Sequence, residues 1–192
     1  MANLRPSPTI DAVVIAEPEV HADSRGLFVE TWRRQWVPGS REMVQANRAN
    51  RSAGSLVGLH YHRFQADYWT VSAGLIRVVL HDLRIGSPTE GATWSFDLGG
   101  EGPDRHKGVY IPSGVAHGFS ALTDATVSYL VDGTYDPADE LGVAWDDPVI
   151  GANWGVVDPV LSNRDRVNPV RADLVTDQIP LFDAGPAGRD VS

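Results

Sequence analysis

A two-residue alternation of apolar and polar side chains most constrains how this chain can fold. In residues 92–98 the apolar side chains Trp94, Phe96 and Leu98 fall on one side of an extended chain. Residues 126–131 alternate in the same way, which is typical of strands that bury one face. Residues 75–80 form a nearly continuous apolar run, which indicates a strand buried on both faces.

Glycine and proline interrupt this pattern at short intervals. The interruptions lie at Gly58, Gly74, Gly86-Ser87-Pro88, Gly99-Gly100, Gly102-Pro103, Pro112-Ser113-Gly114 and Asp132-Gly133. Many short strands separated by such turns predict an all-β sandwich or barrel. Short helical pieces are expected only near residues 31–37 and 169–174, because no stretch shows three turns of amphipathic helix.

The size of the chain suits a single domain. Its 192 residues allow one full-sized core and are few for two. We expect one domain over residues 1–192, with a core at roughly residues 10–170 and a loose, extended tail after Pro180.

Composition excludes several classes of protein. The chain has no cysteine, so disulfides and thiolate metal sites are absent and the cytoplasm is the expected compartment. A net charge of −9 argues against a nucleic-acid partner but leaves room for a small phosphorylated ligand. No apolar run is long enough to cross a membrane, and the N-terminus has no signal-peptide pattern.

Three histidines form the first candidate site. His60 and His62 are two residues apart, which places both imidazoles on one face of a strand. His117 follows the turn at residues 112–114 and enters another predicted strand. A lone histidine here would most simply be a polar residue satisfied at a barrel mouth, but three in two such contexts favour a functional site.

The spacing of these residues resembles the two signatures of the cupin barrel. Gly54, His60-x-His62, Asp67 and Gly74 match the first, with Asp67 where glutamate is usual. Pro112-x-Gly114-x-x-His117 matches the core of the second, although His106 and Ala121 depart from its ends. The resemblance implies an all-β, cupin-type antiparallel barrel (jelly roll) with short peripheral helices.

A narrower resemblance covers residues 18–169. Nine segments stand in the order and rough spacing of the dTDP-4-dehydrorhamnose 3,5-epimerases. They are Asp23-Ser24-Arg25-Gly26-Leu27-Phe28-Val29-Glu30, Gln45-Ala46-Asn47, Gly58-Leu59-His60-Tyr61, Asp82-Leu83-Arg84, Gly86-Ser87-Pro88-Thr89, residues 111–119, Tyr135-Asp136-Pro137, Trp145-Asp146-Asp147-Pro148 and Leu161-Ser162-Asn163-Arg164-Asp165. The chain therefore resembles this family of enzymes, which invert carbons beside the ketone of a nucleotide-linked 4-keto sugar.

The resemblance implies a role for particular residues. His60 would be the catalytic base, Asp165 the carboxylate that orients it, and Tyr129 the acid. Tyr135 would stack on the nucleotide base. Other contacts to the sugar nucleotide would come from Arg25, Glu30, Gln45, Asn47, His117, Glu140 and Arg164. The segment from Arg25 to Glu30 would serve the site of a partner subunit, which implies a homodimer.

Elementary chemistry supports such a reaction without a metal or organic cofactor. A proton on the carbon beside a ketone is acidic because its loss gives an enolate. A neutral imidazole, whose ordinary pKa is about 6.5, is a suitable base near neutral pH. A carboxylate behind the imidazole fixes its tautomer, and a tyrosine on the opposite face can return a proton and so invert the carbon.

Two positions depart from the family. Val57 stands where an arginine expected to contact phosphate is usual, and Asp67 stands where a lysine expected to stabilise the enolate oxygen is usual. Losing such a donor can raise the barrier by about 3–4 kcal/mol. His62, Arg63 and Tyr68 are the nearby candidates to replace it, and Asp67 itself is expected to face the pocket and alter sugar recognition.

Alternatives from other classes remain open at this stage. His60, His62, Asp67 and His117 could together hold Fe, Mn, Ni or Zn in a metal-dependent cupin enzyme. The chain could also be a non-catalytic barrel that binds sugar nucleotides. Trp69, two residues from Asp67, is a candidate to line the pocket, while Asp146-Asp147 is expected to be a solvated turn.

Overall fold

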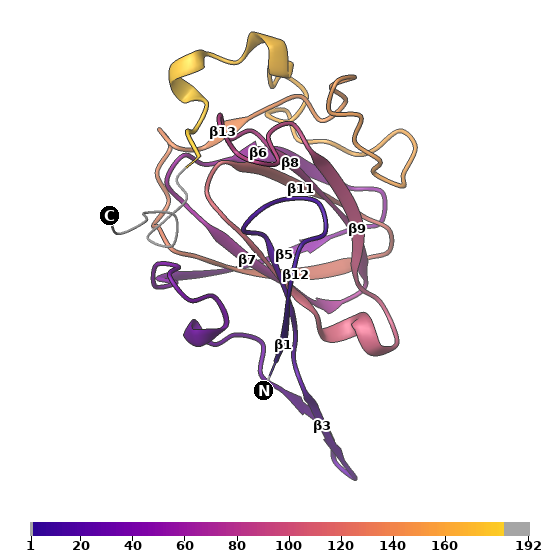
Figure 1. The fold of residues 1–192 in the computed structure, drawn as a ribbon. Coiled ribbons are helices and arrows are strands. Elements are labelled where there is room, and N and C mark those ends of the chain that lie inside the picture. The colour runs from indigo at the N-terminus through magenta and orange to yellow at the C-terminus, as the bar shows by residue number, and fades with distance from the viewer. Residues whose placement is uncertain (1, 183–192) are drawn as a thin grey trace, which may run out of the picture.

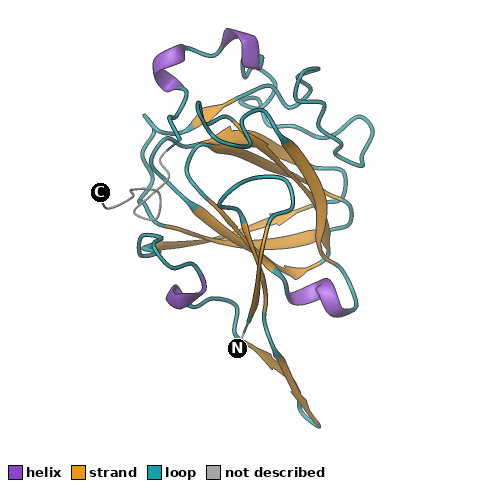
Figure 2. Ribbon diagram, viewed as in Figure 1, coloured by secondary structure: helices purple, strands orange, loops and turns teal. Residues whose placement is uncertain are grey.

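The computed structural model describes residues 2–182, which form two antiparallel sheets that face each other (Figures 1 and 2). The six-stranded sheet has the order β1 (Asn3–Pro6), β2 (Val14–Glu17), β10 (Gly108–Ile111), β7 (Asp67–Ala73), β12 (Ala125–Val131) and β5 (Gln45–Arg51). The five-stranded sheet has the order β13 (Leu141–Gly142), β6 (Leu56–Tyr61), β11 (Val115–Ala121), β8 (Leu75–Asp82) and β9 (Thr93–Gly99). The predicted all-β, cupin-type fold is confirmed.

Helices are confined to single turns at the periphery (Figure 2). Over residues 2–182 they are the 3-10 helices η1 (Arg34–Trp36), η2 (Pro103–His106), η3 (Arg171–Asp173) and η4 (Thr176–Gln178). Helices η1 and η3 fall within the two segments where short helical pieces were predicted. None of the helices in the described part of the chain is long and apolar enough to cross a membrane.

The core explains why residues 75–80 are apolar throughout. Ile76, Val78 and Leu80 of β8 point into the cluster between the sheets, where they pack with residues of β7, β11 and β12. Val79 points to the other face and packs with Leu59 and other residues of a second cluster, under the loops that follow β13. Strand β8 is therefore buried on both sides, as its sequence predicted.

A close approach of β6 and β11 fixes the backbone that carries the site histidines. The two strands pair antiparallel, with His60 opposite His117. Gly58 has a φ of +116°, and a Cβ built on it would lie 2.7 Å from the Cα of Gly118. Only glycine fits this position, since any side chain would push the strands apart.

Strands β3 (Val20–Asp23) and β4 (Gly26–Val29) form a separate hairpin that projects away from the two sheets (Figure 1). Leu27 and Phe28 on this hairpin are 52% and 64% exposed. Near the C-terminus, Leu181 forms a β-bridge with Ile85, so the chain stays packed on the domain as far as Leu181. The rest of the predicted loose tail, residues 183–192, lies outside the described residues.

Candidate active site

A cavity of about 400 Å³ lies between the two sheets. Strands β5, β7 and β12 line it from the six-stranded sheet, and β6 and β11 line it from the five-stranded sheet. The segment after β12 adds Tyr135 and Glu140. The alternation of each strand thus sends one row of side chains into a shared space, which is where a cupin-type barrel holds a small ligand.

His60 and Asp165 lie in contact, although 105 positions separate them in the sequence. The Nε2–H of His60 donates to Oδ1 of Asp165 at 2.6 Å, and the Ser162 hydroxyl donates to Oδ2 at 2.8 Å. Burial by itself would raise the pKa of the Asp165 carboxyl, but the hydrogen bond and charge of His60, the Ser162 hydroxyl and the charge of Arg164 together outweigh it and hold that pKa below its usual value. The ionised carboxylate fixes the proton on Nε2, so Nδ1 of His60 is the nitrogen left to accept one.

Tyr129 lines the cavity from the sheet that faces His60. It sits on β12 directly opposite Asn47 of β5. Burial, reinforced by the Asp67 carboxylate, raises the pKa of Tyr129. The phenol therefore keeps its proton near neutral pH and is available as a proton donor.

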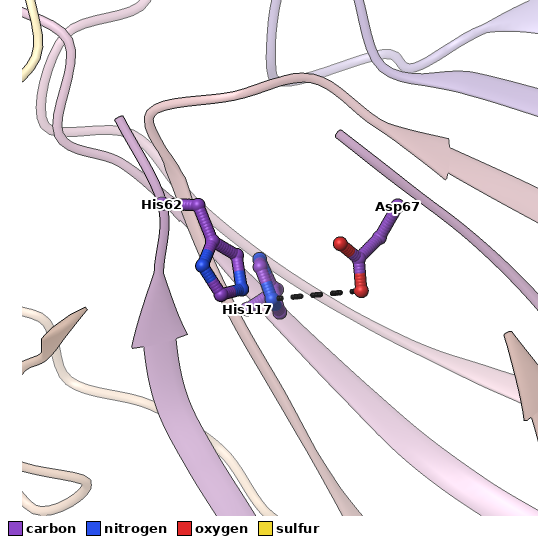
Figure 3. Close-up of side chains that lie close together, drawn as sticks. All are labelled: His62, Asp67 and His117. Atoms are coloured by element: carbon purple, nitrogen blue, oxygen red, sulfur yellow. Dashed lines mark ion pairs between the residues drawn. The ribbon is translucent and has the colours of Figure 1, made fainter. Parts of the chain in front are cut away.

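His62, Asp67 and His117 form a compact cluster on the cavity wall (Figure 3). Each imidazole donates its Nδ1–H to a backbone carbonyl, His62 to Asp139 at 2.8 Å and His117 to Val115 at 2.9 Å. Burial lowers the pKa of His117 to about 4, which keeps its ring neutral. Its Nε2 then faces Oδ2 of Asp67 at 4.0 Å as an acceptor, so this wall is rich in acceptors.

These three residues have the composition of a metal site, because one ligand atom from each lies within 4.8 Å of the others. The fourth predicted ligand, His60, does not belong to the group and is bound to Asp165 instead. Both carboxylate oxygens of Asp67 already accept hydrogen bonds, from Gln65 Nε2 and Trp69 Nε1, each at 3.0 Å. The structure does not bring the four residues of the metallocupin alternative together.

The other residues expected to bind substrate divide into two groups. Gln45, Asn47, Tyr135 and Glu140 line the cavity. Arg164 lies beside them, since it donates to Glu140 at 2.9 Å, and Tyr135 is 67% exposed at the cavity.

Arg25 and Glu30 lie apart from this cavity. Arg25 is on the β3–β4 hairpin, where it pairs with Asp23 at 2.6 Å, and Glu30 pairs with Arg33. Neither residue lines the cavity of its own chain. Their expected role in a partner's site therefore stays a prediction.

Three expectations about individual side chains are wrong. Arg63 does not line the cavity and instead lies near Asp139, at 3.7 Å, while Tyr68 packs with Trp32 on the opposite face of β7. Neither can replace the missing lysine. Asp147 is not solvated: it is buried and accepts backbone N–H groups from Val149, Ile150 and Arg171, which hold the turn.

Sequence reasoning missed some residues of the cavity. Among them are Gln65 and Arg51, which both line it. Trp69, a candidate from the sequence, does line the cavity and also donates a hydrogen bond to Asp67. Arg51 could have been found from its spacing, because Gln45, Asn47 and Arg51 are separated by even numbers of residues and so share one face of a strand.

Comparison with known proteins shows which family of enzymes the chain is similar to. A family model described as dTDP-4-dehydrorhamnose 3,5-epimerase matches residues 7–173. The dTDP-4-dehydrorhamnose 3,5-epimerase of Mycobacterium tuberculosis is 39% identical over 169 residues, which cover 82% of this chain and 82% of that protein. The dTDP-4-dehydrorhamnose 3-epimerase of Streptomyces niveus is 36% identical over 165 residues, 82% of this chain and 78% of that protein.

Solved structures agree with these relatives. A 4-keto-6-deoxy sugar epimerase from the novobiocin cluster of Streptomyces spheroides superposes with a TM-score of 0.86 at 34% identity, covering 95% of this chain and 94% of that one. An epimerase from Legionella pneumophila, in complex with dTDP-4-keto-L-rhamnose, gives 0.88 at 29% identity, covering 96% and 100%. Fold, site and relatives define an isomerase built on a cupin-type barrel. The chain belongs to the dTDP-4-dehydrorhamnose 3,5-epimerase family.

Proposed function

We propose that this enzyme epimerises a dTDP-linked 4-keto-6-deoxyhexose in deoxysugar biosynthesis. It inverts carbon 3, carbon 5 or both by moving a proton on the carbon beside the ketone. The observation that carries the proposal is the position of His60, which lines one wall of the cavity with Asp165 hydrogen-bonded to it, while Tyr129 lines the facing wall. A base and an acid on opposite walls are what inversion of a carbon between them requires.

The proton movements follow from the protonation states of these groups. Nδ1 of His60 takes the proton from the carbon, and the electron pair left behind forms the enolate. Asp165 stabilises the resulting imidazolium through the bond to Nε2. Tyr129 then gives its phenolic proton to the opposite face of the carbon. Solvent returns a proton to Tyr129 and removes one from His60, so the cycle balances without a metal or an organic cofactor.

Asp67 places a negative charge on the cavity wall where the family usually has the positive charge of a lysine. A carboxylate beside the developing enolate would repel it, so the ketone oxygen must lie near other groups. The amide of Asn47, directly across from Tyr129, is a neutral donor on the cavity wall. Asp67 and His117 instead accept hydrogen bonds, which favours the hydroxyl-bearing side of the sugar at that wall.

The nucleotide half of the substrate is proposed to stack on Tyr135. The exposed ring of Tyr135 at the cavity is suited to a nucleobase, and Gln45, Glu140 and Arg164 offer polar partners around it. Solved relatives that are described as complexes with dTDP or dTDP-sugars support this class of ligand.

The working form is proposed to be a cytoplasmic homodimer. The projecting β3–β4 hairpin carries exposed Leu27 and Phe28, together with Arg25, and contributes nothing to the cavity of its own chain. Docking it on a second copy would bury the apolar side chains and bring Arg25 to the partner's site. Light scattering should give twice the mass of one chain, and a monomer at micromolar concentration would contradict the proposal.

Nuclear magnetic resonance of a dTDP-4-keto-6-deoxyhexose mixed with the enzyme tests the reaction. Signals of an epimer inverted beside the ketone should grow with enzyme concentration and should disappear with His60→Ala. An unchanged substrate spectrum, recorded with protein that binds TDP, would show that the chain is a binding protein rather than an epimerase.

A further inference from the structure

Arg51 is the single lysine or arginine among the described residues that line the cavity. Among the same lining residues, the carboxylates are Asp67 and Glu140, and Glu140 forms an ion pair with Arg164. Arg51 forms no ion pair with any residue of the described range, and its one recorded hydrogen bond runs from Nη1 to the carbonyl of Asn50 at 2.9 Å. The cavity therefore holds one cation that has no anionic partner among residues 2–182.

The alternation of β5 aims this cation at the cavity. Along Gln45–Arg51, every second residue is partly buried and lines the cavity, and the residues between them are exposed. Arg51 is the last of the inward row and lies opposite Ala125 of β12. It is four residues beyond Asn47, the partner of Tyr129, which places its Cα about 13 Å further along the strand.

A short turn over residues 52–55 joins Arg51 to β6, which begins at Leu56. Arg51 and Val57 thus lie at the same end of the cavity, on facing sheets. Val57 offers no charge there. A cation needed at this end of the cavity must accordingly come from the β5 side.

We propose that Arg51 binds the diphosphate of the nucleotide sugar. The inference rests on the proposed function, because that substrate carries a diphosphate between sugar and nucleoside. With the sugar held between His60 and Tyr129, the next group of the ligand lies further along the cavity, and the guanidinium of Arg51 is suited to pair with phosphate oxygens there. The protein has a net charge of −9, so an anionic ligand depends strongly on such a local cation.

Calorimetry with TDP and with thymidine tests the assignment, using wild type, Arg51→Gln and Arg48→Gln. Arg48 is on the same strand but on its exposed face, so it is a matched control for the loss of one charge. Arg51→Gln should weaken TDP binding by about 10- to 150-fold, as expected for a hydrogen bond to a charged group, and should leave thymidine binding unchanged. Arg48→Gln should bind both ligands as wild type does, and Arg51→Lys should retain part of the TDP affinity.

The two proposals fail in different ways. If wild type prefers TDP over thymidine and Arg51→Gln keeps the same preference, Arg51 does not bind the diphosphate, although the proposed function stands. If wild type does not bind TDP, the proposed function is wrong and this inference is wrong with it. Unchanged thymidine binding shows that Arg51→Gln is folded.

Discussion

Replacing Asp165 with asparagine should slow the reaction without weakening substrate binding. The change keeps the shape of the side chain but removes the charge that Nε2 of His60 contacts at 2.6 Å. Asp165 is 3% exposed and does not line the cavity, so the substrate does not touch it. The loss should therefore appear in kcat and leave KM nearly unchanged.

The magnitude follows from the kind of bond that is lost. A hydrogen bond to a charged group contributes about 1.5–3 kcal/mol, which corresponds to a fall in kcat of about 10- to 150-fold for Asp165→Asn. Ser162→Ala is the matched control, because it removes only a neutral hydroxyl that donates to the other carboxylate oxygen at 2.8 Å. Because Ser162→Ala leaves the charge of Asp165 beside His60, the fall in kcat should be smaller than the fall for Asp165→Asn.

The assay is initial-rate epimerisation across a range of substrate concentrations, with thermal unfolding of each variant as a check on folding. A kcat of Asp165→Asn within a factor of three of wild type would refute the reasoning. It would mean that the carboxylate does not assist the proton transfer at His60, however close the two groups lie.

Three further perturbations follow from the structure. Tyr135→Ala should weaken TDP binding by about 5- to 150-fold in a titration, since stacking on a base is about 1–3 kcal/mol, whereas Tyr135→Phe should bind almost normally because it keeps the ring; equal losses in both would contradict stacking. Burial lowers the pKa of His81 to about 4, below about 6.5 in the unfolded chain, so the folded state binds protons less readily, and the free energy of unfolding should fall by about 3 kcal/mol from pH 7 to pH 4. In urea titrations at several pH values, the free energy of unfolding of His81→Leu should depend less on pH than that of wild type. An equal pH dependence in the two proteins would show that buried His81 is not the cause of the loss. Dialysis against a chelator should leave the epimerase rate unchanged, and elemental analysis that finds about one transition metal per chain, lost together with activity, would restore a metal-dependent mechanism through His62, Asp67 and His117.

The strands were predictable because their sequence pattern and their burial have the same physical cause. The apolar run at residues 75–80 is continuous because β8 has a cluster on each face, and the alternation at 92–98 reflects a strand with one buried face. The same rule could have excluded Tyr68, since Asp67 and Trp69 face the cavity and their intervening neighbour must face away.

The contact between His60 and Asp165 could not have been derived from spacing. It depends on how the segment after β13 packs against β6, a long-range arrangement that local patterns do not encode. Only the resemblance to a known family indicated it. Asp147 shows the same limit. Its sequence context suggests a solvated turn, but Asp147 is buried and accepts hydrogen bonds from the backbone N–H groups of Val149, Ile150 and the distant Arg171.

The central claim is that His60 removes a proton from one face of a carbon and Tyr129 returns one to the other. Nuclear magnetic resonance in heavy water, comparing wild type, His60→Ala and Tyr129→Phe, tests it most directly. Wild type should incorporate deuterium beside the ketone and invert that carbon, and His60→Ala should do neither. Tyr129→Phe should still incorporate deuterium but without inversion, because the base remains and the acid is gone. Inversion at the wild-type rate in Tyr129→Phe, or deuterium incorporation that survives in His60→Ala, would contradict this account.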